Sequence, residues 1–135
     1  MAQFYTIAEA NALLPELTTL LEEMRTQGQQ LASLQEKQVE VLKKMKGNGH
    51  HDPTEDATVT GLVQSLEEDL RQGITQLAEW GIQLKNLGTG LVDFPALREG
   101  RTVLLCWQLG EPEVAYWHET TTGFAGRQPL TDQFL

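Results

Sequence analysis

The sequence predicts an α+β protein: a long, coiled-coil-like antiparallel helical hairpin followed by a small three-stranded antiparallel β-meander. Two observations lead to this fold class. Apolar residues recur at steps of three and four through the N-terminal part of the chain, and from Gly88 onward the pattern changes to period two. The 135 residues, 40% of them hydrophobic and 21% charged, suit one globular domain over residues 1–135.

The first helix is predicted over residues 6–46. Thr6 and Glu9 have the spacing of a capping box, which satisfies free backbone donors at a helix start. A break is expected near Pro15, because proline lacks a backbone N–H and clashes with the preceding turn. The apolar stripe of this helix comprises Leu13, Leu17, Leu20, Met24, Leu31, Leu34, Val41 and Met45.

The second helix is predicted over residues 54–87, after a Gly-rich loop. Adjacent His50 and His51 lie in this loop, where two neighbouring side chains rarely face one ion, so a solvated hairpin tip is expected. Gly73 and Gly81 lie along the stripe of the second helix and indicate close helix approach or a ligand slot. The stripe comprises Val59, Val63, Leu66, Leu70, Ile74, Leu77, Leu84 and Leu87.

The apolar stripes are wider than a single partner helix can cover. The widening comes from the doublets Leu13/Leu14, Leu20/Leu21 and Val41/Leu42. An isolated hairpin would leave much apolar surface in water. Pairing of two copies into a four-helix bundle would cover it, so a homodimer is expected.

The β-meander is predicted over residues 90–119, with a hairpin turn at 110–113 and an irregular tail at 120–135. Its strands are expected at 91–94, ended by Pro95, at 102–109 and at 114–119. A turn centred on Glu111 would pair Cys106 with Tyr116 and Leu104 with His118. One face would then be apolar and pack on the helices; it comprises Val92, Phe94, Val103, Leu105, Trp107, Ala115 and Trp117.

The opposite face of the meander would carry Asp93, Cys106 and His118. A carboxylate, a thiolate and an imidazole form a donor set that suits a zinc or iron ion. The same residues allow a purely structural role, in which His118 bonds a carboxylate and Cys106 is a small buried side chain. A Cys–His nucleophilic pair oriented by Asp93 is a third alternative, although no oxyanion hole is evident.

A second polar cluster comprises Glu111, Glu119 and Arg127. The guanidinium of Arg127 could form paired hydrogen bonds with the carboxylate of Glu111, Glu119 or Asp93 as a structural clamp. It could also bind an anionic ligand in the same way.

Composition restricts the partners. Nineteen acidic residues against 10 Lys plus Arg give a net charge of -9, which disfavours nucleic acid and anionic membranes. A single cysteine excludes an internal disulfide. With no predicted membrane span or secretory signal, a cytoplasmic protein is expected.

Several short motifs carry a family resemblance. They include Phe4–Asn11 with Leu13-Leu14-Pro15, Gly81–Lys85, Gly90–Ala96, Leu105-Cys106-Trp107, Tyr116–Glu119 and Gly123–Arg127. On these residues the chain resembles the prokaryotic domain of unknown function 2203 family over nearly its whole length. The resemblance implies a small bacterial protein without an established activity. Asn86 stands where the family is expected to carry aspartate, so no carboxylate is available there.

Three functions follow from these observations. The leading one is a homodimeric interaction or scaffold protein, since most of the chain forms amphipathic helices. The alternative is a metal- or small-ligand-binding protein, with hydrolysis as one activity that such a site allows, and with its site around Asp93, Cys106 and His118. A third is an assembly factor that offers its helical groove to an amphipathic partner protein. Whether the protein is an enzyme stays open at this point.

Overall fold

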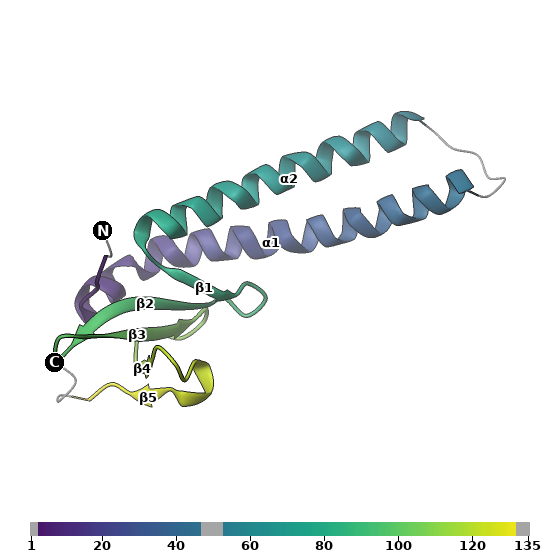
Figure 1. Cartoon of the computed structure of the whole chain (residues 1–135). Coiled ribbons are helices and arrows are strands. Elements are labelled where there is room, and N and C mark those ends of the chain that lie inside the picture. Colours follow the sequence, from purple (N-terminus) through teal and green to yellow (C-terminus); the bar gives the residue numbers. More distant parts are fainter. Residues whose placement is uncertain (1–2, 47–52, 132–135) are drawn as a thin grey trace. The chain divides into compact units, whose positions relative to one another are not determined.

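A computed structural model describes residues 3–46 and 53–131, and His50 and His51 lie outside these ranges. The described residues form two α-helices, a 3-10 helix and one five-stranded antiparallel sheet, so the α+β class is confirmed (Figure 1). The elements are α1 (Ile7–Lys46), α2 (Pro53–Trp80), β1 (Gln83–Asn86), β2 (Leu91–Arg98), β3 (Arg101–Gln108), β4 (Tyr116–Glu119), η1 (Phe124–Gly126) and β5 (Gln128–Pro129).

The chain divides into two compact units. The sheet unit comprises Met1–Glu22 and Thr75–Leu135, and the hairpin unit comprises Glu23–Ile74. The sheet unit therefore holds all five strands together with the first turns of α1 and the last turns of α2. None of the described helices combines the length and the apolar character that a membrane-spanning segment needs.

Helix α1 starts as predicted and continues where a break was expected. Thr6 N donates to Glu9 Oε1 at 3.0 Å, and Glu9 N donates to Thr6 Oγ1 at 3.1 Å, which completes the capping box. The predicted break near Pro15 is wrong, because α1 is continuous from Ile7 to Lys46. Pro15 removes one helical donor, but Leu14 and Leu17 beside it are buried, and their packing offsets that loss.

Helix α2 ends seven residues earlier than the predicted Leu87, at Trp80. Gly81 follows it with a φ of 75°, in the left-handed region that glycine adopts most readily. Gly81 N donates to Ala78 O, and Ile82 N donates to Leu77 O, both at 3.0 Å. This is a Schellman motif, so Gly81 terminates the helix and is not a site of close helix approach.

Gly73, in the hairpin unit, does mark a close helix approach. A Cβ at Gly73 would lie 2.7 Å from Met24 Sδ. Glycine at this position therefore lets α2 approach the Met24 side chain on α1, which confirms the packing interpretation for Gly73.

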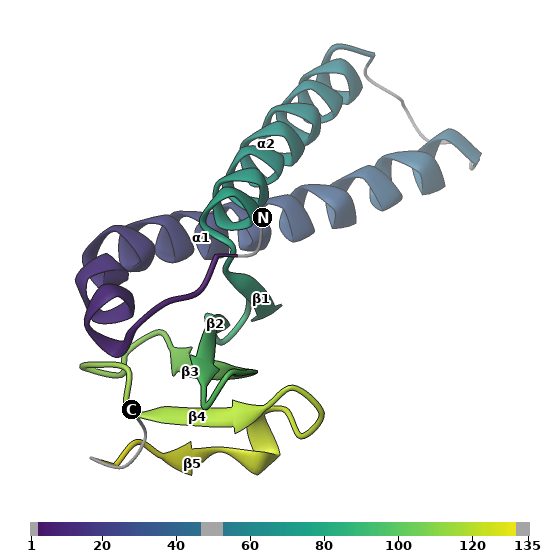
Figure 2. The same ribbon diagram turned by 60° about the vertical axis from the view of Figure 1, so that its left-hand side comes forward.

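The sheet has the order β1-β2-β3-β4-β5, with every neighbouring pair antiparallel. Three predicted strands become five because residues 83–86 extend the sheet at β2 and residues 128–129 extend it at β4. Figure 2 shows β5 beside β4 at one edge of the sheet. Leu84 and Leu87 continue the leucine period of α2, which is why the sequence analysis placed them in a helix.

Pro95 lies within β2, which continues to Arg98 instead of ending at Phe94. The carbonyl of Pro95 accepts a hydrogen bond from Tyr5 N at 2.7 Å. Because the N and O atoms of one strand residue face the same side, the missing N–H also faces Tyr5 and not β3. The proline therefore costs no hydrogen bond of the β2–β3 ladder.

The predicted pairing of the second and third predicted strands is confirmed: Cys106 lies opposite Tyr116, and Leu104 lies opposite His118. The two faces of the sheet therefore separate as expected, except that β4 begins at Tyr116 and not at the predicted Val114, so Ala115 lies before the strand and is only partly buried. The buried apolar face contains Val92, Phe94, Val103, Leu105, Trp107 and Trp117. Tyr5, just before α1, packs edge-on against Phe94 with ring centroids 5.2 Å apart.

Candidate metal centre

Three neighbouring strands bring Asp93, Cys106 and His118 together on the second face of the sheet. Asp93 on β2 lies directly opposite Cys106 on β3, and His118 on β4 lies opposite Leu104, two residues from Cys106. One carboxylate oxygen, the thiol sulfur and one ring nitrogen all lie within 4.8 Å of one another. All three residues are at least 98% buried. Sequence reasoning named these residues, and metal binding by them stays a prediction.

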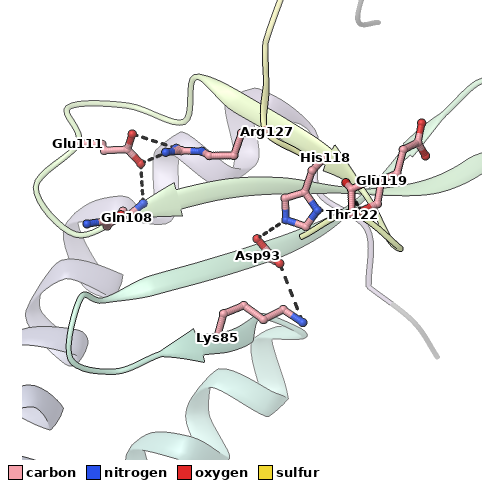
Figure 3. A network of polar contacts seen from close by, with 8 residues as sticks. All are labelled: Lys85, Asp93, Gln108, Glu111, His118, Glu119, Thr122 and Arg127. Atoms are coloured by element: carbon pink, nitrogen blue, oxygen red, sulfur yellow. Dashed lines mark hydrogen bonds and ion pairs between the residues drawn. The ribbon is translucent and has the colours of Figure 1, made fainter. Parts of the chain in front are cut away.

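The ring of His118 is held by hydrogen bonds at both nitrogens (Figure 3). Nδ1 lies 2.7 Å from the backbone oxygen of Glu119, and Nε2 lies 3.0 Å from Asp93 Oδ1. A carbonyl oxygen can only accept, so Nδ1 carries a proton. The Nε2–Oδ1 hydrogen bond needs a proton on one of its two atoms, and a metal ion bound to Nε2 would take the place of that proton. Metal-ligating histidines commonly have this arrangement, because the second hydrogen bond orients the ring.

Lys85 on β1 reaches the same cluster from the side of Asp93. Its Nζ lies 4.0 Å from Asp93 Oδ2, while Asp93 Oδ1 faces His118 (Figure 3). The Lys85 side chain is 44% exposed, so its ammonium group lies between the buried carboxylate and solvent. Sequence reasoning missed Lys85 because it assigned residues 83–86 to a helix. The polar residues Gln83 and Lys85 are two positions apart, which is the spacing of one strand face, and this spacing could have indicated a strand.

Burial and, to a smaller extent, the negative charge of Asp93 together raise the pKa of the Cys106 thiol to about 12. The nearby guanidinium of Arg127 acts in the opposite direction but does not reverse the shift. The thiol is therefore protonated near neutral pH in the absence of a metal. This disfavours Cys106 as a nucleophile, which needs a lowered pKa, and His118 Nε2 faces Asp93 instead of the sulfur.

Arg127 joins the tail to the β3–β4 loop. Its Nη2 donates to both carboxylate oxygens of Glu111, at 2.8 and 2.9 Å, and its guanidinium stacks 4.0 Å from the ring centroid of Tyr116. Gln108 N donates to Glu111 Oε1 at 2.7 Å. These contacts are those of a structural clamp. Glu119 lies apart from it, because Arg101 Nη1 donates to both of its carboxylate oxygens at 2.6 Å.

The fold and the cluster define the class of protein to which the chain belongs. It is an α+β protein with a helical hairpin and an antiparallel sheet, and the sheet carries a buried Asp–Cys–His cluster. The chain belongs to the family described as uncharacterized conserved protein (DUF2203), whose model matches residues 3–130. No curated protein and no solved structure gives a significant match. The family carries no assigned activity, so the function must be argued from the cluster itself.

Proposed function

We propose that the protein binds one divalent transition-metal ion, zinc or ferrous iron, through Asp93, Cys106 and His118. The observation that carries this proposal is the convergence of three donor atoms within 4.8 Å on three adjacent strands. The hydrogen bond from His118 Nδ1 to the Glu119 carbonyl supports it, since it leaves Nε2 available as the ligand. Only a small movement of the three donor atoms toward one another would let each lie about 2.0–2.3 Å from a shared ion.

The donor set favours a borderline-soft divalent ion over magnesium or calcium. Zinc and ferrous iron accept a mixture of sulfur, nitrogen and oxygen ligands, whereas magnesium and calcium prefer oxygen alone. A thiolate and a carboxylate carry two negative charges, which a divalent ion neutralises in this buried position. Cys106 loses its thiol proton when the ion binds, because only the thiolate is a metal ligand.

Elemental analysis of protein purified without an affinity tag tests the proposal. We expect about one zinc or iron ion per chain, and Co²⁺ added to metal-free protein should produce a thiolate-to-cobalt charge-transfer band. Cys106→Ser should abolish that band. Glu119→Gln is the matched control, because its carboxylate contacts Arg101 and not the cluster. Less than about 0.1 ion per chain, with no cobalt band, would leave the cluster with a structural role only.

A second candidate function rests on the hairpin unit, which exposes apolar side chains. Val39, Leu42, Leu62 and Ile74 are each about half exposed. A groove of about 440 Å³ runs between the helices; its lining residues are Gln30, Ser33, Leu34, Leu62, Ser65 and Leu66. We propose that this groove pairs with a second copy to form a four-helix bundle, so that the protein acts in assembly.

Analytical ultracentrifugation tests this second candidate. The wild-type protein should be dimeric at micromolar concentration, and Leu62→Glu should make it monomeric. Gln64→Glu is the matched control, because it adds the same charge to α2 outside the groove-lining residues. A wild-type protein that is monomeric at about 100 μM would contradict self-pairing and leave the groove for a different helical partner.

The proposed thiolate ligand also bears on location. Thiols stay reduced in the cytoplasm, so a free cysteine ligand favours a cytoplasmic location, which we propose for this protein.

A further inference from the structure

We infer that the metal centre, once loaded, binds a small monoanion at a coordination position left open by the protein, with Lys85 as the charge that attracts it. This inference rests on the proposed metal binding. It concerns a different property, because it assigns the ligand class of the centre and a role for a residue that holds no metal.

The number of ligands leaves a position open. Within residues 3–46 and 53–131, the His, Cys, Asp and Glu side chains that converge at this point are those of Asp93, Cys106 and His118. Zinc sites with four protein ligands are closed and structural, whereas sites with three protein ligands bind water or a substrate atom in the fourth position. Three converging donors therefore match the open kind of site, at which an external ligand binds the ion directly.

The charge of the loaded centre favours an anion. The carboxylate of Asp93 and the thiolate of Cys106 contribute -2, the ion contributes +2, neutral His118 contributes nothing, and Lys85 adds +1. The arithmetic leaves a surplus of one positive charge. The guanidinium of Arg127 does not change this sum, because both carboxylate oxygens of Glu111 accept its hydrogen bonds.

Lys85 supplies this surplus positive charge directly beside the proposed metal ligands. Its Nζ lies 4.0 Å from Asp93 Oδ2, the oxygen that does not face His118. The Lys85 side chain is 44% exposed, so solvent screens part of its charge, whereas the three donor residues that it faces are 1–2% exposed. The same burial limits the ligand to a small one. Together these features select a small monoanion such as a short carboxylate.

The test uses the full-length protein loaded with one equivalent of Co²⁺ and titrated with azide. Azide bound directly to cobalt shifts the visible d–d bands, so binding is read without any assay of activity. We expect saturable binding, and Lys85→Met should raise the dissociation constant of azide about tenfold while the cobalt stoichiometry stays unchanged. Lys37→Met is the matched control, because this exposed lysine of the hairpin unit pairs with Glu55 at 3.7 Å.

Imidazole serves as a neutral probe of the same position. If charge selects the ligand, Lys85→Met should weaken azide binding and leave imidazole binding unchanged. An equal loss for both ligands, or a loss of cobalt binding, would make Lys85 a residue that positions Asp93 and would overturn the inference.

The outcomes separate this inference from the proposal beneath it. If cobalt does not bind, the metal proposal fails and takes the anion inference with it. If cobalt binds one per chain and azide leaves its spectrum unchanged, the metal proposal stands and the anion inference alone is wrong.

Discussion

Both units bury apolar side chains, but among the described residues the buried polar or charged ones all lie in the sheet unit. In the sheet unit, Asp93 and His118 are 1% and 2% exposed, so charged and polar groups lie in the interior. In the hairpin unit, Leu62 and Ile74 are 49% and 55% exposed, so apolar groups face solvent. Two helices can cover only one face of each other, whereas an antiparallel sheet brings distant residues into one closed cluster.

This difference indicates which kind of contact each unit is suited to make. Buried polar groups must find partners inside the protein, so the cluster of the sheet unit is defined atom by atom. Half-exposed leucines have no such requirement, so the hairpin unit is suited to contacts with another chain. The following predictions test this division.

The largest effect is expected from Trp107→Ala in the sheet unit. Trp107 is buried, and its Nε1 donates to the Glu111 carbonyl at 3.0 Å. The substitution should lower the free energy of unfolding by about 3–5 kcal/mol, through the cavity and the lost hydrogen bond. Ile74→Ala in the hairpin unit should change it by only about 0.5 kcal/mol. Urea unfolding followed by circular dichroism compares the two; equal losses would contradict the division.

Asp93→Ala should destabilise the metal-free protein by about 3 kcal/mol, because it leaves His118 buried without its carboxylate partner. Glu119→Ala breaks the pair with Arg101, whose side chain is half exposed, and should cost less than about 1 kcal/mol. Thermal and urea unfolding in the presence of a chelator measure both. A loss for Asp93→Ala as small as that for Glu119→Ala would show that the buried cluster tolerates an unpaired imidazole.

Stability of the metal-free protein should fall at alkaline pH. Burial raises the pKa of Cys106 from 9.0 to about 12, so the folded protein keeps a thiol proton that the unfolded chain releases above pH 9. The contribution is fully present below pH 9 and is lost as pH rises toward 12.

Between pH 8 and pH 10 the loss attributable to Cys106 should be about 1.4 kcal/mol. Cys106→Ala provides the reference, since it titrates no thiol in this range; the measurement is the difference in unfolding free energy between the two proteins at each pH. A wild-type protein whose pH dependence equals that of Cys106→Ala would show that the thiol is not shielded from solvent.

The smallest effect is expected at the helix ends. Thr6→Ala removes the hydrogen bond to Glu9 N and should cost about 1 kcal/mol. Thr58→Ala in the hairpin unit removes a bond from Oγ1 to the Thr54 carbonyl, which competes with the helix, and should be neutral or slightly stabilising. Thermal unfolding of the two variants compares them. A cost for Thr58→Ala equal to that for Thr6→Ala would show that the carbonyl bond stabilises α2.

What the sequence determined by itself was local or periodic. The Thr6–Glu9 capping box is complete within four residues, so its partners could be recognised without any other part of the chain. The pairing of Cys106 with Tyr116 followed from the position of a short turn and the period of two along a strand. The convergence of Asp93, Cys106 and His118 on one face could be inferred from that pairing.

The tertiary structure decided the features that depend on residues far apart. Pro15 remains inside α1 because the packing of buried neighbours offsets the lost donor, and Pro95 remains inside β2 because its missing N–H faces Tyr5 and not β3. Gly81 ends α2 through a local motif, but it is the pairing with β2 that makes residues 83–86 a strand and brings Lys85 near Asp93. A local pattern cannot specify the fate of the two prolines or of residues 83–86, since each depends on tertiary packing or strand pairing that outweighs the intrinsic preference of the segment.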